Sequence, residues 1–214
     1  MSSGRPRILI ADDHKLMAEL CQRILEREFD VVGIVGNGRE LLRTAVKLQP
    51  EVVLLDIGMP DLNGLDAGKQ LKDLLPAIKL VYLTMVTDPQ IALEALDRGA
   101  SGFLLKTCAA DEVVSAVREA LRGNIFLSPD LKKKVTRLRR HQDDTVGEGN
   151  SLTERQREVL QLLVEGKAMK EVADILDVST KTVAFHKYRI MQVLGAKNNA
   201  ELVRYAIRNH LLVA

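Results

Sequence analysis

Aromatic residues and cysteines are scarce in this chain of 214 residues. Phe, Tyr and Trp make up 3% of it and Trp is absent, which argues against a large aromatic-lined ligand cavity. The two cysteines, Cys21 and Cys108, lack the spacing of metal ligands. Two isolated thiols fit a reducing cytoplasm, and we expect both to be structural residues in or near a core.

Long apolar runs are also missing. No stretch approaches the roughly 18 residues that a membrane-spanning helix needs, and residues 1–6 have no signal-like apolar core. We therefore expect a cytoplasmic protein without a membrane segment. Apolar residues still account for 46% of the chain, which supports real cores, and the length leaves room for one large or two small domains.

The charge is unevenly distributed along the chain. Residues 1–130 carry 15 Lys and Arg against 19 Asp and Glu, a net charge of −4. Residues 131–150 carry 6 against 3, and residues 151–214 carry 10 against 7, so each of these segments has a net charge of +3. A basic C-terminal module is a mild indication of nucleic-acid binding.

Short β-branched runs alternate with amphipathic stretches over residues 5–125. The predicted strands are 7–11, 31–35, 52–55, 79–83 and 101–105. The predicted helices are 14–28, 38–48, 64–75, 88–98 and 111–122. Five strand–helix pairs predict an α/β fold, a parallel sheet with helices on both faces, and the flavodoxin-like strand order 2-1-3-4-5 is the common solution.

The rest of the chain has a helical pattern. We predict a basic helix over 126–141, started by Ser128 and Pro129, and a flexible polar linker over 142–150. An all-α four-helix domain would follow. Its first helix would begin at a capping box of Thr153 and Gln156 and stop at Gly166. The other predicted helices are 168–176, 180–194 and 199–211.

Four predicted strands end in polar residues. Asp12 and Asp13 follow the first strand, Asp56 the third, Thr84 the fourth and Lys106 the fifth. The carboxyl ends of the strands in such a sheet line one crevice, and the expected order makes strands 1 and 3 neighbours. Three carboxylates, a hydroxyl and an ammonium would therefore meet there, which suits a divalent cation and a phosphoryl group.

The carboxylates of this crevice predict a phosphoryl acceptor. Asp56 would be the nucleophile, because a carboxylate that attacks a phosphoryl donor forms an acyl phosphate. Two anions must then approach each other, so a cation is needed. Mg²⁺ fits, held by Asp12, Asp13 and Asp56 and by the backbone carbonyl of Gly58.

The other two polar residues predict a switch. Lys106 would offset the phosphoryl charge, and the Thr84 hydroxyl would donate to a phosphoryl oxygen only after transfer. Neither Gly58 nor Val86 has a side chain that can orient an attacking water. We therefore expect slow self-hydrolysis of the phosphorylated chain.

The helix predicted over 180–194 has two different sides. Its apolar side carries Val183, Ile190, Val193 and Leu194. The opposite side carries Lys181, Ala184, Phe185, His186, Lys187, Tyr188 and Arg189. A basic helix after a tight turn and another helix is the geometry that docks in the DNA major groove. A plain scaffold with a solvated charged face is the alternative, but exposed Phe and Tyr favour a contact surface.

Residues 5–125 resemble the receiver domain of two-component response regulators. The matching residues are Asp12-Asp13, Asp56-Ile57-Gly58-Met59-Pro60 with Gly64, Thr84, and Phe103-Leu104-Leu105-Lys106. The resemblance implies that Asp56 is the phosphoacceptor and that Asp12 and Asp13 bind Mg²⁺. It also implies that Phe103 swings inward when Thr84 moves. Thr107 stands where many receivers have Pro, so the isomer of the Lys106–Thr107 peptide stays open.

Residues 151–214 closely resemble the LuxR-type helix-turn-helix. The matching segments are 152–160, 170–173 and 179–183, with His186. The resemblance implies that residues 184, 185 and 188 point at bases. It places the following residues near phosphate: Lys181, Thr182, His186, Lys187 and Arg189. In that family the last helix pairs two such modules.

Together the two segments resemble a response regulator of the NarL/FixJ class. The expected domains are a receiver over 5–125, a linker helix and linker over 126–150, and a DNA-binding domain over 151–214. We expect a cytoplasmic transcription regulator and not an enzyme. Its partners would be a sensor histidine kinase, promoter DNA and a second copy of the chain when phosphorylated or DNA-bound, with RNA polymerase as a further candidate.

Two rival hypotheses stay open. A phosphohydrolase would typically place a second Asp two residues after Asp56 as general acid and base, and that position is Gly58. A DNA-binding protein with a vestigial receiver would act independently of phosphorylation. The sequence does not identify the kinase, the operator, the regulated genes, activation against repression, or release against dimerisation.

Overall fold

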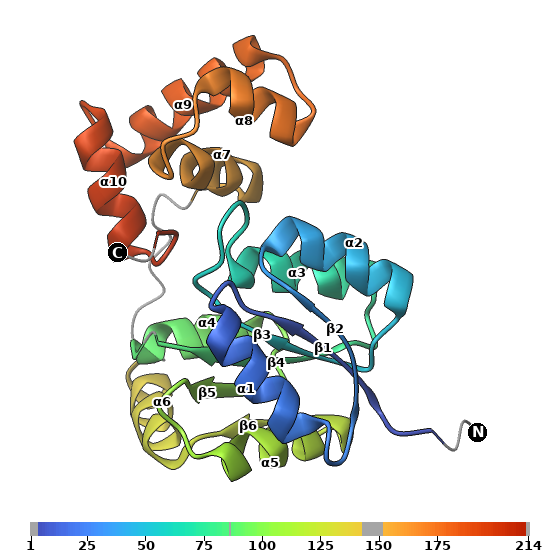
Figure 1. Ribbon diagram of the computed structural model, residues 1–214. Coiled ribbons are helices and arrows are strands. Elements are labelled where there is room, and N and C mark those ends of the chain that lie inside the picture. The colour runs from blue at the N-terminus through green and yellow to red at the C-terminus, as the bar shows by residue number, and fades with distance from the viewer. Residues whose placement is uncertain (1–3, 86, 143–151, 213–214) are drawn as a thin grey trace. The chain divides into compact units, whose positions relative to one another are not determined.

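The computed structural model describes residues 4–85, 87–142 and 152–212, and the chain divides into two compact units between its sixth and seventh helices (Figure 1). The linker predicted over 142–150 lies almost wholly outside the described residues, as does Val86. Within the described part, no helix combines the length and apolar character that crossing a membrane requires.

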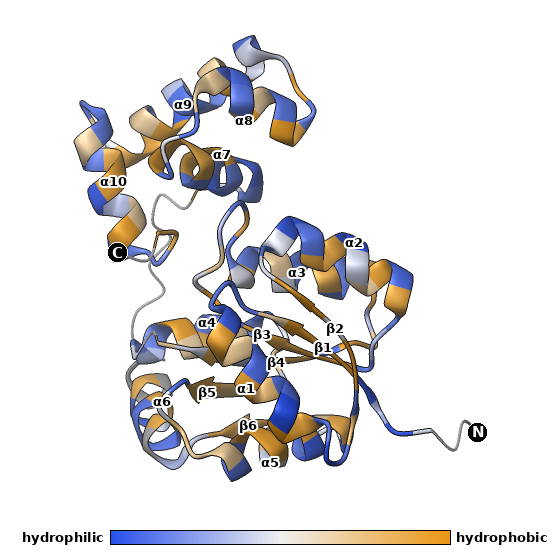
Figure 2. Cartoon of the chain, in the orientation of Figure 1, coloured by the Kyte–Doolittle hydropathy of each residue, from blue (hydrophilic) through white to orange (hydrophobic). Residues whose placement is uncertain are grey.

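The N-terminal unit is built on a parallel sheet. Its strands are β1 (Arg7–Ala11), β2 (Asp30–Val35), β3 (Val52–Leu55), β4 (Lys79–Thr84), β5 (Gly102–Leu105) and β6 (Phe126–Leu127). Their order is β2-β1-β3-β4-β5-β6, which confirms the expected flavodoxin-like order and adds a sixth strand. Hydrophobic residues dominate the central strands (Figure 2), and every residue of β3 is buried, as expected for a strand covered on both faces.

Five helices cover this sheet. They are α1 (Lys15–Leu25), α2 (Gly38–Leu48), α3 (Gly64–Leu74), α4 (Pro89–Asp97) and α5 (Ala110–Leu121). Helices α1 and α5 pack on one face, where Ala18, Val113 and Val117 join strand residues such as Ile10 and Leu54 in one core. Helix α3 lies beside α2 (Figure 1).

Local chemistry sets several helix ends. The Asn37 side chain accepts a hydrogen bond from the Glu40 backbone N–H at 2.8 Å and caps α2. Asp88 caps α4, and Pro89 occupies its first turn. Asn and Asp favour helix starts because their side chains accept hydrogen bonds from the free backbone N–H groups there. Pro is favoured because it has no N–H group that needs a partner.

The helix predicted over 126–141 begins at Pro129, the residue expected at its first helical position, and not at residue 126. Residues Phe126 and Leu127 form strand β6 beside β5, and the Phe126 N–H donates to the Ser101 carbonyl at 3.0 Å. Helix α6 (Pro129–Gln142) begins only after them. It packs against α4, and its Leu131 and Val135 are buried. Two residues are too few to show a strand period, so the residue pattern contains no signal for β6.

The C-terminal unit is all helical, as expected. Its helices are α7 (Glu154–Val164), α8 (Met169–Leu176), α9 (Thr180–Leu194) and α10 (Asn199–Arg208). The predicted capping box is present: Gln156 N–H donates to Thr153 Oγ1 at 3.3 Å, and Thr153 N–H donates to Gln156 Oε1 at 2.9 Å. Gly166 follows α7 with φ of +90°, a conformation that favours glycine. The four helices enclose one apolar core that includes Val159, Val172, Val183 and Leu202.

Candidate functional site

The carboxyl ends of β1, β3, β4 and β5 bring the predicted polar residues together. The Asp56 N–H donates to the Ala11 carbonyl at 2.8 Å, which places Asp56 beside the end of β1. The Lys106 N–H donates to the Thr84 carbonyl at 2.9 Å, which fixes the end of β5 against β4. The carboxyl ends of these strands therefore lie side by side at one edge of the sheet, as the strand pattern predicted.

Gly64 lets the first turn of α3 approach this edge of the sheet. A Cβ atom at Gly64 would lie 2.0 Å from the Asp56 carbonyl oxygen, a distance that no side chain tolerates. The Gly64 N–H donates to the Ile57 carbonyl at 2.9 Å and closes the loop that follows Asp56. Gly58 is half-buried in this loop, two residues after Asp56.

Lys106 joins the two buried carboxylates of the site. Its Nζ lies 2.9 Å from Asp12 Oδ1, 2.8 Å from Asp12 Oδ2 and 2.8 Å from Asp56 Oδ2. The carboxylates are nearly buried, with Asp12 at 6% exposure and Asp56 at 5%. The ammonium therefore occupies the place between them that relieves their mutual repulsion.

Burial and ion pairing act against each other at this cluster. Burial raises the pKa of Asp12, and the hydrogen bond from Lys106 opposes that change. Burial lowers the pKa of Lys106, but its hydrogen bonds to Asp12 and Asp56 outweigh burial and leave the Lys106 pKa above its ordinary value. Lys106 is thus held as a cation.

Asp13 and His14 extend the cluster toward solvent. The His14 Nδ1 lies 2.8 Å from Asp13 Oδ1, and the His14 backbone N–H donates to Asp12 Oδ1 at 2.9 Å. Sequence reasoning did not include His14. Its position in the sequence, directly after the acidic pair and just before α1, could have indicated that it lies at the site.

The donor set fits a divalent cation. Asp12, Asp13, His14 and Asp56 each offer one ligand atom, and these atoms all lie within 4.8 Å of one another. Three of the four are carboxylate oxygens, the hard ligands that Mg²⁺ takes up in proteins. Two of these carboxylates, from Asp12 and Asp13, come from adjacent residues, so one loop presents both.

Thr84 and Phe103 are buried in β4 and β5, two strands whose carboxyl ends lie at the site. Thr84 is 1% exposed at the end of β4, and Phe103 is fully buried in β5. The Phe103 ring packs on Tyr82 with a centroid separation of 6.1 Å, so the aromatic side chain already occupies the interior. Met85, the residue after Thr84, is 62% exposed. The Lys106–Thr107 peptide, whose isomer the sequence left open, is trans.

The second predicted site lies on α9. The turn between α8 and α9 contains Asp177 at φ of +52°, and the Ser179 side chain accepts a hydrogen bond from the Thr182 N–H at 3.1 Å to cap α9. Val183 and Ile190 are buried against the other helices. The helix–turn–helix geometry expected from the sequence is therefore formed.

The residues predicted to contact DNA divide into two groups on α9. The exposed group is Lys181, Ala184, Phe185, Tyr188 and Arg189. Phe185 is 60% and Tyr188 62% exposed, which is unusual for large aromatic side chains in a helical domain. The half-buried group is Thr182, His186 and Lys187.

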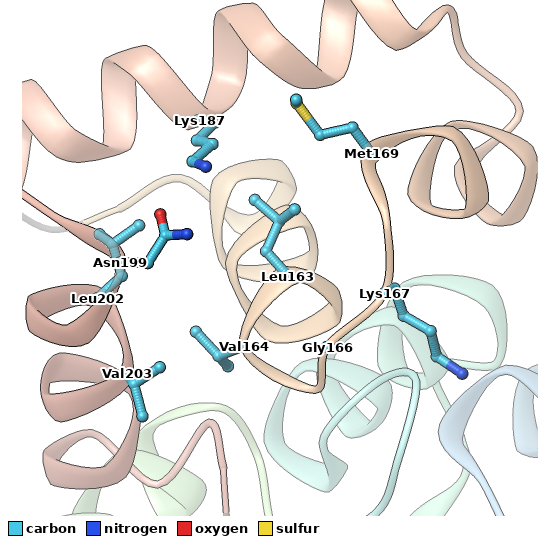
Figure 3. A pocket seen from close by; sticks show the side chains of 9 residues that line it. All are labelled: Leu163, Val164, Gly166, Lys167, Met169, Lys187, Asn199, Leu202 and Val203. Atoms are coloured by element: carbon cyan, nitrogen blue, oxygen red, sulfur yellow. The ribbon is translucent and has the colours of Figure 1, made fainter.

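Lys187 lies away from the exposed group, in a hollow of the C-terminal unit (Figure 3). The hollow has a volume of about 350 Å³ and is lined by residues of α7, α9 and α10, of the α7–α8 loop and of the start of α8. The Lys187 side chain points from α9 toward Asn199. Apolar side chains such as Leu163 and Leu202 form the walls, so the amine lies beside the aliphatic part of the hollow.

Two family models match the chain in consecutive segments. The model described as "Response regulator receiver domain" matches residues 8–118. The model described as "Bacterial regulatory proteins, luxR family" matches residues 150–206. The first segment contains the acidic cluster and Lys106, and the second contains α7 to α9 and most of α10.

Full-length relatives share both segments. The chain is 35% identical over 208 residues to "Transcriptional regulatory protein LiaR" of Bacillus subtilis, with coverage of 96% of this chain and 99% of the relative. It is 34% identical over 216 residues to "Oxygen regulatory protein NreC" of Staphylococcus carnosus, with coverage of 96% and 99%.

Solved structures of response regulators are similar to this chain over both of its segments. The RcsB response regulator of Salmonella typhimurium matches with a TM-score of 0.65 and 27% identity over 98% of this chain and 100% of that one. RcsB of Salmonella enterica serovar Typhimurium, bound to promoter P1flhDC in the presence of the phosphomimetic BeF3−, matches with a TM-score of 0.61 and 28% identity, covering 94% and 98%. These neighbours pair the same two kinds of unit.

Proposed function

Since this chain belongs to the two-component response regulators with a LuxR-type DNA-binding domain, we propose that Asp56 is its phosphoacceptor and α9 its DNA-reading helix. The observation that carries the first assignment is the Lys106 ammonium, held 2.8 Å from Asp56 Oδ2 and equally close to Asp12. An acceptor carboxylate needs a cation beside it, because the incoming phosphoryl group is an anion.

Phosphoryl transfer follows from these positions. A carboxylate oxygen of Asp56 forms a new bond to phosphorus, and the bond from phosphorus to the donor breaks with its electron pair leaving on the donor. Lys106 balances the charge that arrives. Mg²⁺, held by Asp12, Asp13, Asp56 and the Gly58 carbonyl, would neutralise phosphoryl oxygens when bound.

The switch in this proposal uses Thr84 and Phe103. Both side chains are buried, Thr84 at the end of β4 and Phe103 in β5, and Phe103 packs on Tyr82 in β4. A phosphoryl oxygen on Asp56 adds an acceptor that the Thr84 hydroxyl can bond. If Thr84 moves toward this oxygen, Phe103 and Tyr82 have to shift as well, because a close-packed interior does not leave a void.

DNA binding is assigned to the exposed side of α9. Ala184, Phe185 and Tyr188 are placed to contact base edges and thymine methyl groups, since they combine exposure with apolar surface. The residues assigned to phosphate are Lys181, Thr182, His186, Lys187 and Arg189. Lys187 would leave its hollow to reach a phosphate, which its long, flexible stem permits.

The partners follow from the same proposal. The phosphoryl donor is a sensor histidine kinase, and the target is promoter DNA in the cytoplasm. The solved complexes of RcsB with promoter DNA, among them one of two RcsB dimers on two parallel DNAs, support a homodimeric DNA-bound form. RNA polymerase is the partner that a promoter-bound regulator would meet next.

Intact-mass measurement tests the acceptor directly. Incubation with a small acyl phosphate and Mg²⁺ is expected to add the mass of one phosphoryl group to the wild-type chain. The Asp56→Asn variant is expected to keep its fold and gain no mass, because an amide is not a competent nucleophile here. A mass gain of equal size in Asp56→Asn would refute the assignment, and no gain in either chain would favour the vestigial receiver.

A further inference from the structure

Helix α6 carries a dense positive charge that neither site uses. Residues 129–142 contain six Lys and Arg and one acidic residue, Asp130. The basic residues are Lys132, Lys133, Lys134, Arg137, Arg139 and Arg140. Residues 1–130 of the same chain have a net charge of −4, so α6 is a local reversal of charge at the end of an acidic unit.

The structure separates this helix into a buried side and a charged side. Leu131 and Val135 are 2% and 3% exposed and pack the helix onto the N-terminal unit. The first four basic residues are all exposed. Among the side chains that the structure describes, none of these four forms an ion pair. Within that described set, their charge is exposed to solvent and takes no part in an ion pair.

We propose that the exposed side of α6 is an auxiliary binding surface for the phosphate backbone of duplex DNA. Closely spaced phosphates are the partner that a cluster of solvent-facing Lys and Arg fits, and such contacts give affinity without sequence preference. The inference rests on the proposed function, because it assumes that the C-terminal unit binds DNA.

Two other polyanions fit this surface less well. Binding to a lipid surface is strengthened by exposed apolar or aromatic residues next to the basic ones. In α6, Leu131 and Val135 are buried in the fold and Leu138 is half-buried. Binding to single-stranded nucleic acid uses aromatic side chains for base stacking, and residues 129–142 contain no Phe, Tyr or Trp. Duplex phosphate remains the chemistry that matches.

The covalent connection keeps α6 close to the DNA-reading unit. Residues 143–153 separate the last residue of α6 from the first residue of α7. A polypeptide of that length reaches no farther than roughly 40 Å, even when fully extended. A DNA segment held by the C-terminal unit is thus present at high effective concentration for α6.

The salt dependence of DNA binding tests this surface. The test variant replaces Lys132, Lys133, Lys134 and Arg137 by Gln in the full chain. The matched control replaces Arg23, Arg27, Arg43 and Lys47, four exposed basic residues elsewhere in the same unit, by Gln. Affinity for a short mixed-sequence duplex is measured at several salt concentrations, and thermal melts of both variants report on folding.

The α6 variant is expected to show a shallower slope of log affinity against log salt, by about 0.9 for each phosphate that α6 no longer neutralises, with the control unchanged. Equal slopes in wild type, control and variant would overturn the inference while leaving the proposed function intact. A wild-type chain that binds no duplex would instead overturn the proposed function. Weaker binding of the α6 variant to anionic vesicles, with DNA binding unchanged, would assign α6 to membranes and also refute the inference.

Discussion

At the scale of single residues, the Lys106 ammonium neutralises the buried carboxylates of the acceptor site before any phosphoryl group arrives. Lys106 contacts both buried carboxylates, and its raised pKa keeps it charged. Removing one member of a buried ionic cluster is costlier than removing all of it, because the remaining charges lose their partner. Lys106 is therefore predicted to stabilise the fold as well as to serve phosphorylation.

Replacing Lys106 by Met tests that dual role. The variant leaves Asp12 and Asp56 adjacent, buried and without their cation, and we expect it to lower the unfolding free energy by about 3 kcal/mol. Mg²⁺ should recover part of the loss, because the ion supplies the missing positive charge. Urea unfolding of both chains with and without Mg²⁺ measures this.

The control for this experiment is Lys79→Met, which removes a half-buried lysine at the start of β4, away from the acidic cluster. The control should show no extra dependence on Mg²⁺. A Lys106→Met chain as stable as wild type, or one that Mg²⁺ stabilises no more than the control, would contradict the electrostatic role of Lys106 in the cluster.

Several site residues could be predicted from their position in the strand pattern alone. Asp12, Asp56 and Lys106 each follow a buried strand, and parallel strands present their carboxyl ends at one edge. His14 could not be found in this way, because it follows the acidic pair and not a buried strand. Nor does the sequence show that Lys187 lies in a hollow, since this depends on how α7 and α10 pack beside α9.

At the scale of elements, the contact between α3 and β4 depends on one missing side chain. The Tyr82 hydroxyl lies against Gly68 in α3, where a Cβ atom would be 2.0 Å from it. The same hydroxyl is 3.5 Å from the Gly64 carbonyl oxygen, to which it donates. Burial raises the pKa of Tyr82, so the hydroxyl keeps its proton.

Gly68→Ala is expected to destabilise the receiver by about 1–3 kcal/mol, because overpacking outweighs the better helix propensity of Ala. In a Tyr82→Phe background the cost should shrink, since the clashing oxygen is gone and the nearest ring atom is 3.1 Å away. Chemical unfolding of the four chains gives the coupling between the two positions. Equal costs in both backgrounds would show that the hydroxyl is not the reason for glycine.

The elements themselves were largely predictable, and the exceptions have a physical reason. Helices such as α2 and α9 were predicted with their observed first and last residues. In each, a capping residue stands directly before the stretch of helical apolar spacing. Strand β6 was missed because its two residues gain their partners from β5 and not from local pattern. Helix α10 ends at Arg208, earlier than the predicted residue 211.

At the scale of the whole molecule, the chain joins an acidic unit with the proposed phosphoacceptor to a basic unit with the proposed DNA-reading helix. Family and class could be inferred from the sequence, because two consecutive motifs carry them. The mode of coupling could not, since a sequence contains no measure of the free energy that links two units.

The decisive measurement is the affinity of the full chain for its own operator, selected from random DNA, before and after treatment with acyl phosphate and Mg²⁺. We expect phosphorylation to change the dissociation constant by about tenfold, within the usual range for coupled sites, and Asp56→Asn to show no response. Equal affinity of the wild-type chain in both states would contradict control by phosphorylation and favour a DNA-binding protein that acts independently of its receiver.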